Sequence, residues 1–407
     1  MSKRAIAILV ACFVTTFTTY AIRYGYGVFL PEMLPSLFIS KTEAGVIYAS
    51  YFVAYTIFSP VLGLMGDRYD TRIILTLFSA ILGIGTFLMA FSSSATTASL
   101  YFAIAGIGAS ACWAPVMALA QRWVSDRRRG TILALIDVGS SLGIIYTGTA
   151  IPLVIMAYSW RTGWMSLGAL GFLISLMNYI MVRNRPLVPS GLNRTSPDQQ
   201  SREPLSKVYA RLLHNIRFWL IGLAYLLTGF SILIPFTFLS TYAVHELALP
   251  YEVAVRLVMV IGISAMAGKI TLGPISDRLG RIRIMMLCAV LIAVGSLGIA
   301  YAPGLTLLIP ATVVFGLGYG TVWSMYAASA SDYFSKSLAG SIVGLWTVFL
   351  GVGSILSPII AGWIADTTGT LTWSFILAMA AAIVSLFLLL PVLSQPMALP
   401  PGDFEDL

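Results

Sequence analysis

The chain has 407 residues, of which 58% are hydrophobic and only 10% are charged, and its mean hydropathy is +0.90. This composition excludes a soluble globular domain of this length and places the chain in a lipid bilayer. The apolar stretches do not alternate with polar residues, as the strands of a membrane barrel would, so helices are expected.

Twelve apolar segments follow one another along the chain, and each is long enough to cross about 30 Å of hydrocarbon as an α-helix. A polar stretch separates the sixth segment from the seventh. The pattern predicts an all-α polytopic membrane protein with twelve transmembrane helices arranged as two pseudo-symmetric six-helix bundles. The segments span about residues 5–30, 44–66, 73–92, 97–121, 131–156, 162–182, 217–243, 251–275, 283–302, 304–330, 339–365 and 371–393.

The polar stretch, residues 183–216, is rich in Pro, Ser, Asn and charged residues. This composition is typical of a linker, and one surface helix is expected near residues 205–213. We therefore predict an N-terminal bundle over residues 1–182, a cytoplasmic linker over 183–216, a C-terminal bundle over 217–393 and a cytoplasmic tail over 394–407.

A net charge of +8 could indicate nucleic-acid binding, but most of the 24 Lys and Arg residues fall at the N-terminus or in alternate connections between the segments. That asymmetry follows the positive-inside rule. It predicts a multi-pass protein of the plasma (inner) membrane with both termini in the cytoplasm, in contact with the lipid bilayer and with no nucleic-acid partner. The basic residues that lie elsewhere are Arg23, Lys41, Arg161, Arg256 and Lys269.

The two halves of the sequence align with each other at an offset of 210 residues. Because each half has an even number of helices, such a duplication preserves orientation, and parallel repeats of this kind suit an alternating-access transporter. The matched positions are Gly63, Asp67 and Arg68 with Gly273, Asp277 and Arg278; Gly106 and Gly108 with Gly316 and Gly318; Trp113 with Trp323; and Ser125, Gly130 and Gly143 with Ser335, Gly340 and Gly353.

The six-plus-six arrangement and two turns, GLMGDRYDTR and GPISDRLGRIR, resemble the major facilitator superfamily. In that family the turn reads roughly G-x-x-x-D-R-x-G-R. The resemblance implies that its glycines allow close helix crossing and that its Asp and Arg form a conformational latch with a neighbouring helix end. The second copy matches the pattern better, because the first has Asp70 and Thr71 where Gly and Arg are usual. The latch residues implied are Gly63, Asp67, Arg68, Gly273, Asp277, Arg278 and Arg281.

Three further stretches resemble the monocarboxylate-transporter-like and oxalate/formate-antiporter-like branches of this family. They are the RWVSDRRRG loop over residues 122–130, the Trp160-Arg161 pair, and the Ser357-Pro358, Gly362 to Asp366 and Gly369 pattern. In those relatives a cation on the eighth helix, usually arginine, meets the substrate carboxylate. This sequence has Lys269 there, so the bidentate recognition that arginine provides is not available.

Few charges fall within the predicted bilayer, where each one is costly. At a rise of about 1.5 Å per residue, Arg23 lies about 27 Å along the first helix, in its outer half. Lys269 lies about 12 Å from the turn at Asp277, and Asp137 about 10 Å from the inner end of the fifth helix. These three residues are the candidate ionic groups.

Each of the three charges has two interpretations. Lys269 either binds an anion or tethers two helices, for instance to Asp137. Arg23 either contacts the substrate or a gate, or extends towards the outer interface or pairs with Glu32 or Glu43. Asp137 either couples transport to protons or forms a structural pair. Proton coupling is conceivable because desolvation and a nearby cation can change the proton affinity of a buried carboxylate.

Aromatic residues accompany the charges. Trp113 and Trp323 occupy equivalent positions in the fourth and tenth helices, too deep for an interfacial belt, and either line the substrate site or fill the interface between the halves. Tyr20 is three residues from Arg23 and shares its helix face. Tyr326, one turn from Trp323, is the matching candidate in the second half.

No Walker loop, metal-ligand cluster or nucleophile constellation is present, so we expect neither an enzyme nor a cofactor. Two buried cations against one buried acid leave a positive excess that favours an anionic substrate. We predict a secondary transporter of a small organic anion, most simply a monocarboxylate carried with a proton, that works as a monomer. Two alternatives are an efflux antiporter for an amphipathic drug or metabolite and a non-transporting membrane sensor on the same fold.

Overall fold

The computed structural model of the chain describes residues 3–124, 129–183, 212–334 and 339–393, with the side chains of all of these except 63–68, 129–131 and 339–341. Most of the predicted linker, most of the surface helix expected near residues 205–213, and the predicted tail lie outside the described residues, and residues 212–214 are helical. Among the described residues the structure contains twelve helical spans long and apolar enough to cross a membrane. The predicted all-α polytopic fold is therefore confirmed.

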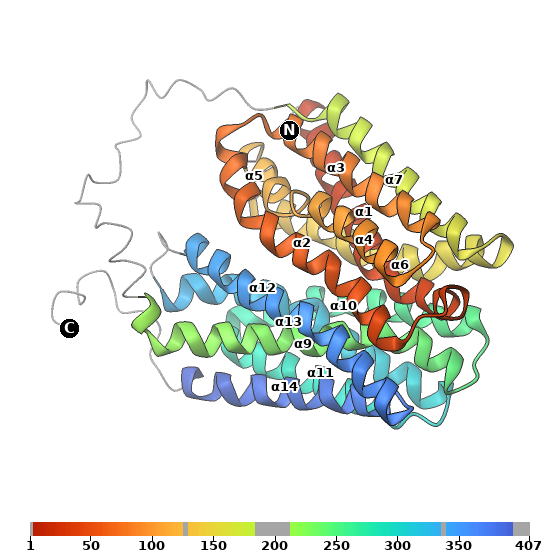
Figure 1. The fold of residues 1–407 in the computed structure, drawn as a ribbon. Coiled ribbons are helices and arrows are strands. Elements are labelled where there is room, and N and C mark those ends of the chain that lie inside the picture. Colours follow the sequence, from red (N-terminus) through yellow and green to blue (C-terminus); the bar gives the residue numbers. More distant parts are fainter. Residues whose placement is uncertain (1–2, 125–128, 184–211, 335–338, 394–407) are drawn as a thin grey trace, which may run out of the picture.

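The first six spans form one bundle, coloured red to yellow-green in Figure 1. Helix α3 packs against α7, α1 against α6, and α2 against α4. The elements are α1 (Lys3–Leu37), α2 (Lys41–Arg68), α3 (Thr71–Leu88) with a 3-10 turn at Met89–Phe91, α4 (Ala95–Ala109), α5 (Ala114–Arg122), α6 (Arg129–Ala157) and α7 (Trp160–Met181).

The other six spans form the second bundle, coloured green to blue in Figure 1. Helix α11 packs against α12 and α14, and α9 packs against α13 and α14. The elements are α9 (Ile216–His245), α10 (Tyr251–Leu279), α11 (Arg281–Ala300), α12 (Leu305–Tyr333), α13 (Ala339–Thr368) and α14 (Thr372–Leu393).

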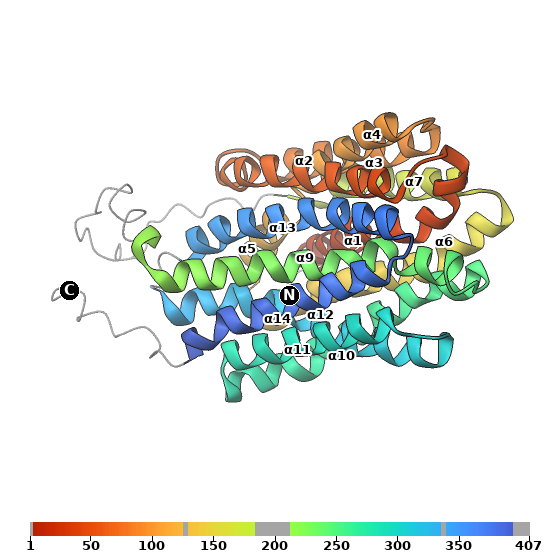
Figure 2. The same cartoon turned by 60° about the horizontal axis from the view of Figure 1, so that its bottom comes forward.

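Two ends of the molecule can be told apart by topology. At the linker end α1 and α9 begin and α7 and α14 end. At the hairpin end lie the short connections α1–α2, α3–α4, α6–α7, α9–α10, α11–α12 and α13–α14. The helices run between these two ends in both views (Figures 1 and 2).

The fourth span consists of two helices, whereas the sequence predicted a single helix over residues 97–121. The structure ends α4 at Ala109 and starts α5 at Ala114, with Trp113 outside helical geometry. Pro115 explains the break, because it has no N–H to donate and its ring would clash with the carbonyl of Ala111 in a continuous helix. The repeat-related position holds Met325, and α12 is continuous there.

The two bundles meet along three helix pairs: α2 with α13, α6 with α10, and α1 with α9. Glycine permits the closest approaches. A Cβ added at Gly27 of α1 would lie 2.1 Å from the Phe236 carbonyl oxygen of α9, and one added at Gly45 of α2 would lie 2.1 Å from the Pro358 carbonyl oxygen of α13. Both glycines are towards the hairpin end, where the backbones of the two bundles therefore touch.

Candidate functional site

Arg23 is the most buried charged side chain of the candidate site, with 7% of its surface exposed. Its guanidinium carbon lies 4.4 Å from the ring centroid of Tyr55 and 5.2 Å from that of Tyr20. Its Nε donates a hydrogen bond of 3.3 Å to the Tyr51 hydroxyl. The Nη2 atom is buried and has no hydrogen-bond partner. The site thus holds a guanidinium surrounded by rings, with one donor nitrogen unused.

No carboxylate of the described residues forms an ion pair with Arg23. Glu43, one of the two acids considered as partners, instead accepts a hydrogen bond of 2.8 Å from the Ser40 backbone N–H. Burial of the side chain also argues against its extension to the membrane surface. A buried cation without a carboxylate is costly, so its retention here has to be explained by packing against rings or by a ligand.

An aromatic cluster continues from Arg23 into the second bundle. The ring of Tyr24 lies 4.2 Å from that of Phe236 and 5.7 Å from that of Tyr319, and both partners belong to the other bundle. Tyr319 lies 6.2 Å from Trp323. The close approach at Gly27 is what brings the aromatic residues of α1 onto those of α9 and α12.

The predicted aromatic residues are distributed unequally around this cluster. Tyr20 lies beside Arg23, and Trp323 contacts Tyr225 edge to face at 5.7 Å. Tyr326 is fully buried in its own bundle, where its hydroxyl lies 2.8 Å from that of Thr228. It therefore packs within the second bundle.

Trp113 is the second tryptophan of the repeat pair, and its partly buried side chain sits at the break between α4 and α5. Among the described residues no aromatic ring pairs with it, and its indole Nε1 is buried without an acceptor. The structure therefore does not bring Trp113 into the aromatic cluster.

Lys269 and Asp137 meet between α10 and α6, on opposite bundles. The Lys269 Nζ lies 2.7 Å from the Asp137 Oδ2 and donates to the Asp137 carbonyl at 3.1 Å and to the Ser140 hydroxyl at 2.8 Å. An ammonium group has three donors, so each of them has an acceptor here. Of the two arrangements considered for Lys269, this conformation contains the helix tether.

The second latch turn is held by Arg281. Its guanidinium lies 2.6 Å from Asp277 and 3.8 Å from Asp332 at the end of α12, and it also donates to the Ser276 hydroxyl. Arg278 is exposed. A Cβ added at Gly273 meets no atom within 4 Å, so the close crossing implied there does not occur among the described residues. The surroundings of Gly63 and the side chains of Asp67 and Arg68 lie outside the described part of the chain.

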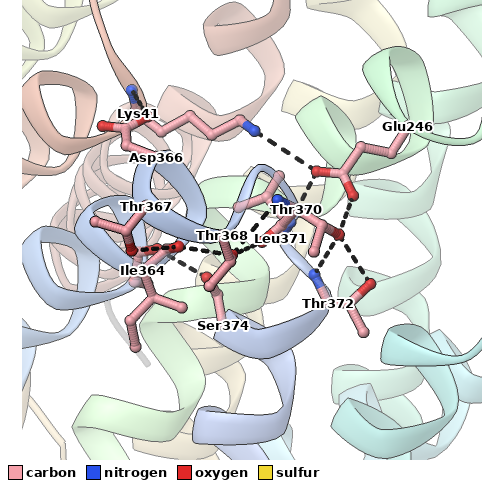
Figure 3. A network of polar contacts seen from close by, with 11 residues as sticks. Lys41, Glu246, Ile364, Asp366, Thr367, Thr368, Thr370, Leu371, Thr372 and Ser374 are labelled. Atoms are coloured by element: carbon pink, nitrogen blue, oxygen red, sulfur yellow. Dashed lines mark hydrogen bonds and ion pairs between the residues drawn. The ribbon is translucent and has the colours of Figure 1, made fainter.

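A polar network joins the bundles at the hairpin end (Figure 3). Asp366 of α13 accepts hydrogen bonds from the Lys41 N–H at 3.0 Å and from the Thr42 N–H and hydroxyl at 2.8 and 2.5 Å. Glu246 lies 3.6 Å from Lys41 and accepts from the Leu371 N–H at 2.8 Å. Asp366 thus caps the N-terminus of α2 from the other bundle.

The sequence interpretation missed several of these residues. Tyr51 and Tyr55 are one helical turn apart on α2. This spacing is the only feature of the sequence that indicates that they share a helix face. For Tyr319, Tyr225 and Glu246 the chain carries no comparable signal. Asp366 lies 325 residues from Lys41, and in the sequence it stands out only as part of a motif.

Comparison with known proteins identifies the family. A family profile described as "Major Facilitator Superfamily" matches residues 12–301 and 257–406. The chain is 24% identical over 396 residues to "Monocarboxylate transporter 12" of Xenopus laevis, covering 91% of this chain and 85% of the relative. It is also 24% identical over 428 residues to "Hexuronate transporter" of Bacillus subtilis, covering 97% of each.

A solved structure has the same fold as this chain. The crystal structure of the nucleoside transporter NupG superimposes with a TM-score of 0.76 at 16% identity and covers 95% of this chain and 99% of its own. The profile match extends over most of the chain, and the twelve spans, the paired bundles and the repeated turn agree with it. The chain is a multi-pass membrane transporter that belongs to the Major Facilitator Superfamily.

Proposed function

We propose that this protein is a secondary transporter of a small organic anion, most simply a monocarboxylate, and that Arg23 binds the anion. The observation that carries the proposal is the guanidinium of Arg23, which is 7% exposed, unpaired with any described carboxylate, and has its Nη2 unused. A carboxylate would supply both the missing negative charge and the missing acceptor in one group. Guanidinium binds carboxylates with two parallel hydrogen bonds.

Coupling to protons is proposed for Asp137. Import of an anion against a negative-inside potential costs about 2.3 kcal/mol per charge for each 100 mV, so accumulation needs a co-transported cation or an exchange partner. Protonation of Asp137 would remove its ion pair with Lys269, 2.7 Å away between the bundles. Lys269 would then be free to contact the anion while the bundles move apart there.

The proposed orientation places the linker end in the cytoplasm of a cell whose plasma membrane contains the protein as a monomer. Its support is the positive-inside distribution of Lys and Arg. With that orientation the hairpin end faces outwards, and the network around Asp366 and Glu246 closes the outer side in this conformation. Alternating access then requires this network to break.

Uptake into proteoliposomes tests the proposal. Purified protein should accumulate radiolabelled short monocarboxylates when the outside is more acidic than the inside, and an ionophore that collapses the proton gradient should abolish accumulation. Arg23→Gln should abolish uptake and binding. Arg256→Gln is the matched control, because Arg256 is exposed and pairs only weakly with Glu252 on its own helix, at 3.9 Å.

Other outcomes would contradict the proposal. Gradient-driven export of amphipathic cations or neutral drugs without carboxylate uptake would indicate an efflux antiporter. Carboxylate binding without counterflow in either direction would indicate a sensor. Normal uptake by Arg23→Gln would remove Arg23 from the anion site.

A further inference from the structure

The surroundings of Arg23 restrict the class of anion, an inference that rests on the proposed function. A guanidinium presents its hydrogen-bond donors in its own plane, at its edge. The Nε is engaged by the Tyr51 hydroxyl at 3.3 Å, and the buried Nη2 is unused. A carboxylate is therefore expected to dock at the edge that contains Nη2, and the rest of the anion must extend from that edge among the neighbouring side chains.

Those neighbouring side chains are mostly rings. Around the guanidinium carbon lie the centroids of Tyr55 at 4.4 Å, Tyr20 at 5.2 Å, Tyr51 at 5.6 Å and Phe52 at 5.8 Å. Tyr51 and Phe52 are buried, at 0% and 5% exposure, and serve as packing for the arginine. Tyr20 and Tyr55 keep part of their surface exposed, so these two rings can also contact a ligand.

Beyond Tyr20 the packing stays aromatic, and Tyr24 and Tyr319 are buried at 4% and 3% exposure. Tyr24 lies 5.7 Å from Tyr20, Tyr319 lies 5.7 Å from Tyr24, and the partly exposed Trp323 follows at 6.2 Å. These rings offer faces, edges and phenol hydroxyls. A sugar acid needs acceptors and donors for each of its hydroxyl groups, since unpaired buried polar groups are costly. A planar aromatic body instead finds stacking and edge-to-face partners.

We propose that the preferred substrate is an arene carboxylate, with its carboxylate on Arg23 and its ring against Tyr20 and Tyr55. The two bundles supply different parts of this site, because Arg23, Tyr20 and Tyr55 belong to the first and the extension through Tyr319 and Trp323 to the second. An aromatic substrate that also reaches Trp323 touches both bundles and is released when they separate.

Binding of four matched probes to the purified full-length protein tests this assignment by isothermal titration calorimetry. Benzoate and cyclohexanecarboxylate have the same charge and nearly the same size and differ in aromaticity. Benzamide keeps the ring and removes the charge, and glucuronate keeps the charge on a polar ring. Benzoate is expected to bind at least about five-fold more tightly than cyclohexanecarboxylate, the scale of aromatic pairing, and benzamide and glucuronate more weakly still.

A variant separates ring recognition from charge recognition. Tyr55→Leu keeps an apolar side chain of similar bulk, so benzoate should lose its advantage over cyclohexanecarboxylate while both still bind. Tyr101→Leu is the matched control, because Tyr101 is a partly buried tyrosine on α4 outside the aromatic cluster. It should leave the benzoate preference unchanged.

The outcomes distinguish this inference from the proposed function. If cyclohexanecarboxylate or glucuronate binds as tightly as benzoate, and Arg23→Gln abolishes that binding, the arene assignment is wrong and the anion site stands. If the benzoate preference survives Tyr55→Leu and Tyr20→Leu together, the assignment is likewise wrong. If none of the carboxylates binds, both the inference and the proposed function fail.

Discussion

Arg23 and Lys269 show how two cations within the predicted bilayer take different roles. The ammonium of Lys269 has an acceptor for each of its donors and a carboxylate at 2.7 Å. The guanidinium of Arg23 has tyrosine rings and one hydroxyl as neighbours, with no described carboxylate in an ion pair. The Arg23 Nη2 has no hydrogen-bond partner that an anion would have to displace, whereas at Lys269 an anion would have to displace acceptors.

Replacing Arg23 by lysine tests the importance of its planar shape. Lys keeps the charge and loses the fork of donors, so a bidentate carboxylate contact becomes a single one. Since a hydrogen bond to a charged group contributes about 1.5–3 kcal/mol, we expect carboxylate binding to weaken about 10- to 100-fold, as measured by calorimetry. Arg256→Lys at the exposed rim should not change affinity, and wild-type affinity of Arg23→Lys would exclude a bidentate contact.

The Lys269–Asp137 pair makes a second prediction, about stability. Lys269→Met or Asp137→Asn alone leaves a partly buried charge without its partner, whereas the double variant removes both charges. Because the side chains are 17% and 35% exposed, we expect a modest coupling of about 1 kcal/mol, at the low end for contacting residues. Thermal unfolding in detergent measures it in a double-mutant cycle. Strictly additive effects would mean that the pair contributes nothing to stability.

At the scale of elements, the N-terminus of α2 depends on the other bundle. The first N–H groups of a helix have no partner within it, and its dipole favours a negative charge there. Asp366 of α13 satisfies two of these groups, the N–H groups of Lys41 and Thr42. A cap of this kind is worth about 0.5–2 kcal/mol. The same hydrogen bonds to Asp366 therefore stabilise α2 and hold the two bundles together at the hairpin end.

Asp366→Asn should shift the protein towards a conformation open at the hairpin end. Asn keeps the shape of the side chain but loses the charge and one of the two acceptor oxygens, so we expect a shift of about 1 kcal/mol, roughly five-fold in population. Spin labels at Phe38 and Tyr301, which are 94% and 63% exposed on opposite bundles, would report a longer distance. Glu252→Gln, within one helix, is the control. An unchanged distance distribution would show that Asp366 does not control closure.

At the scale of the whole molecule, the two bundles touch through backbone at the hairpin end and through the Lys269–Asp137 pair farther along. The helix pairs α2 with α13, α6 with α10 and α1 with α9 form this contact surface. The molecule can open at its hairpin end only if all of these contacts between the bundles break in the same transition. A substitution that holds the two bundles apart at the hairpin end should therefore reduce transport while substrate binding persists.

Gly45→Trp is such a change. A Cβ at Gly45 would lie 2.1 Å from the Pro358 carbonyl oxygen, so an indole there must push α2 and α13 apart. We expect counterflow to fall by at least about ten-fold while carboxylate binding persists. Gly304→Trp is the control, because a Cβ at Gly304 meets no atom within 4 Å. Normal counterflow by Gly45→Trp would show that this contact does not have to close during transport.

The candidate site was only partly predictable. Arg23, Lys269 and Asp137 can be found by counting charges, because a charge in hydrocarbon is costly whatever the fold. Tyr55 and Tyr319 cannot be separated from the other tyrosines among the 19 in the chain, since only contacts between helices distinguish them. The first helix shows the same limit: its predicted end was near residue 30, yet α1 continues to Leu37, and Met33 within this extension packs against Trp164 of α7.

The sequence by itself determined that this is a twelve-span membrane protein built from two repeats of the Major Facilitator Superfamily. Hydrophobic length, the 210-residue repeat and the turn at Gly273 to Arg283 are properties of stretches of chain and need no knowledge of neighbours. Only the tertiary structure decided that Lys269 is paired, that Arg23 is surrounded by rings, and that Asp366 caps α2 from 325 residues away. The physical reason is that ion pairing and capping depend on which helices meet, and helix packing brings together residues whose separation in sequence carries no signal.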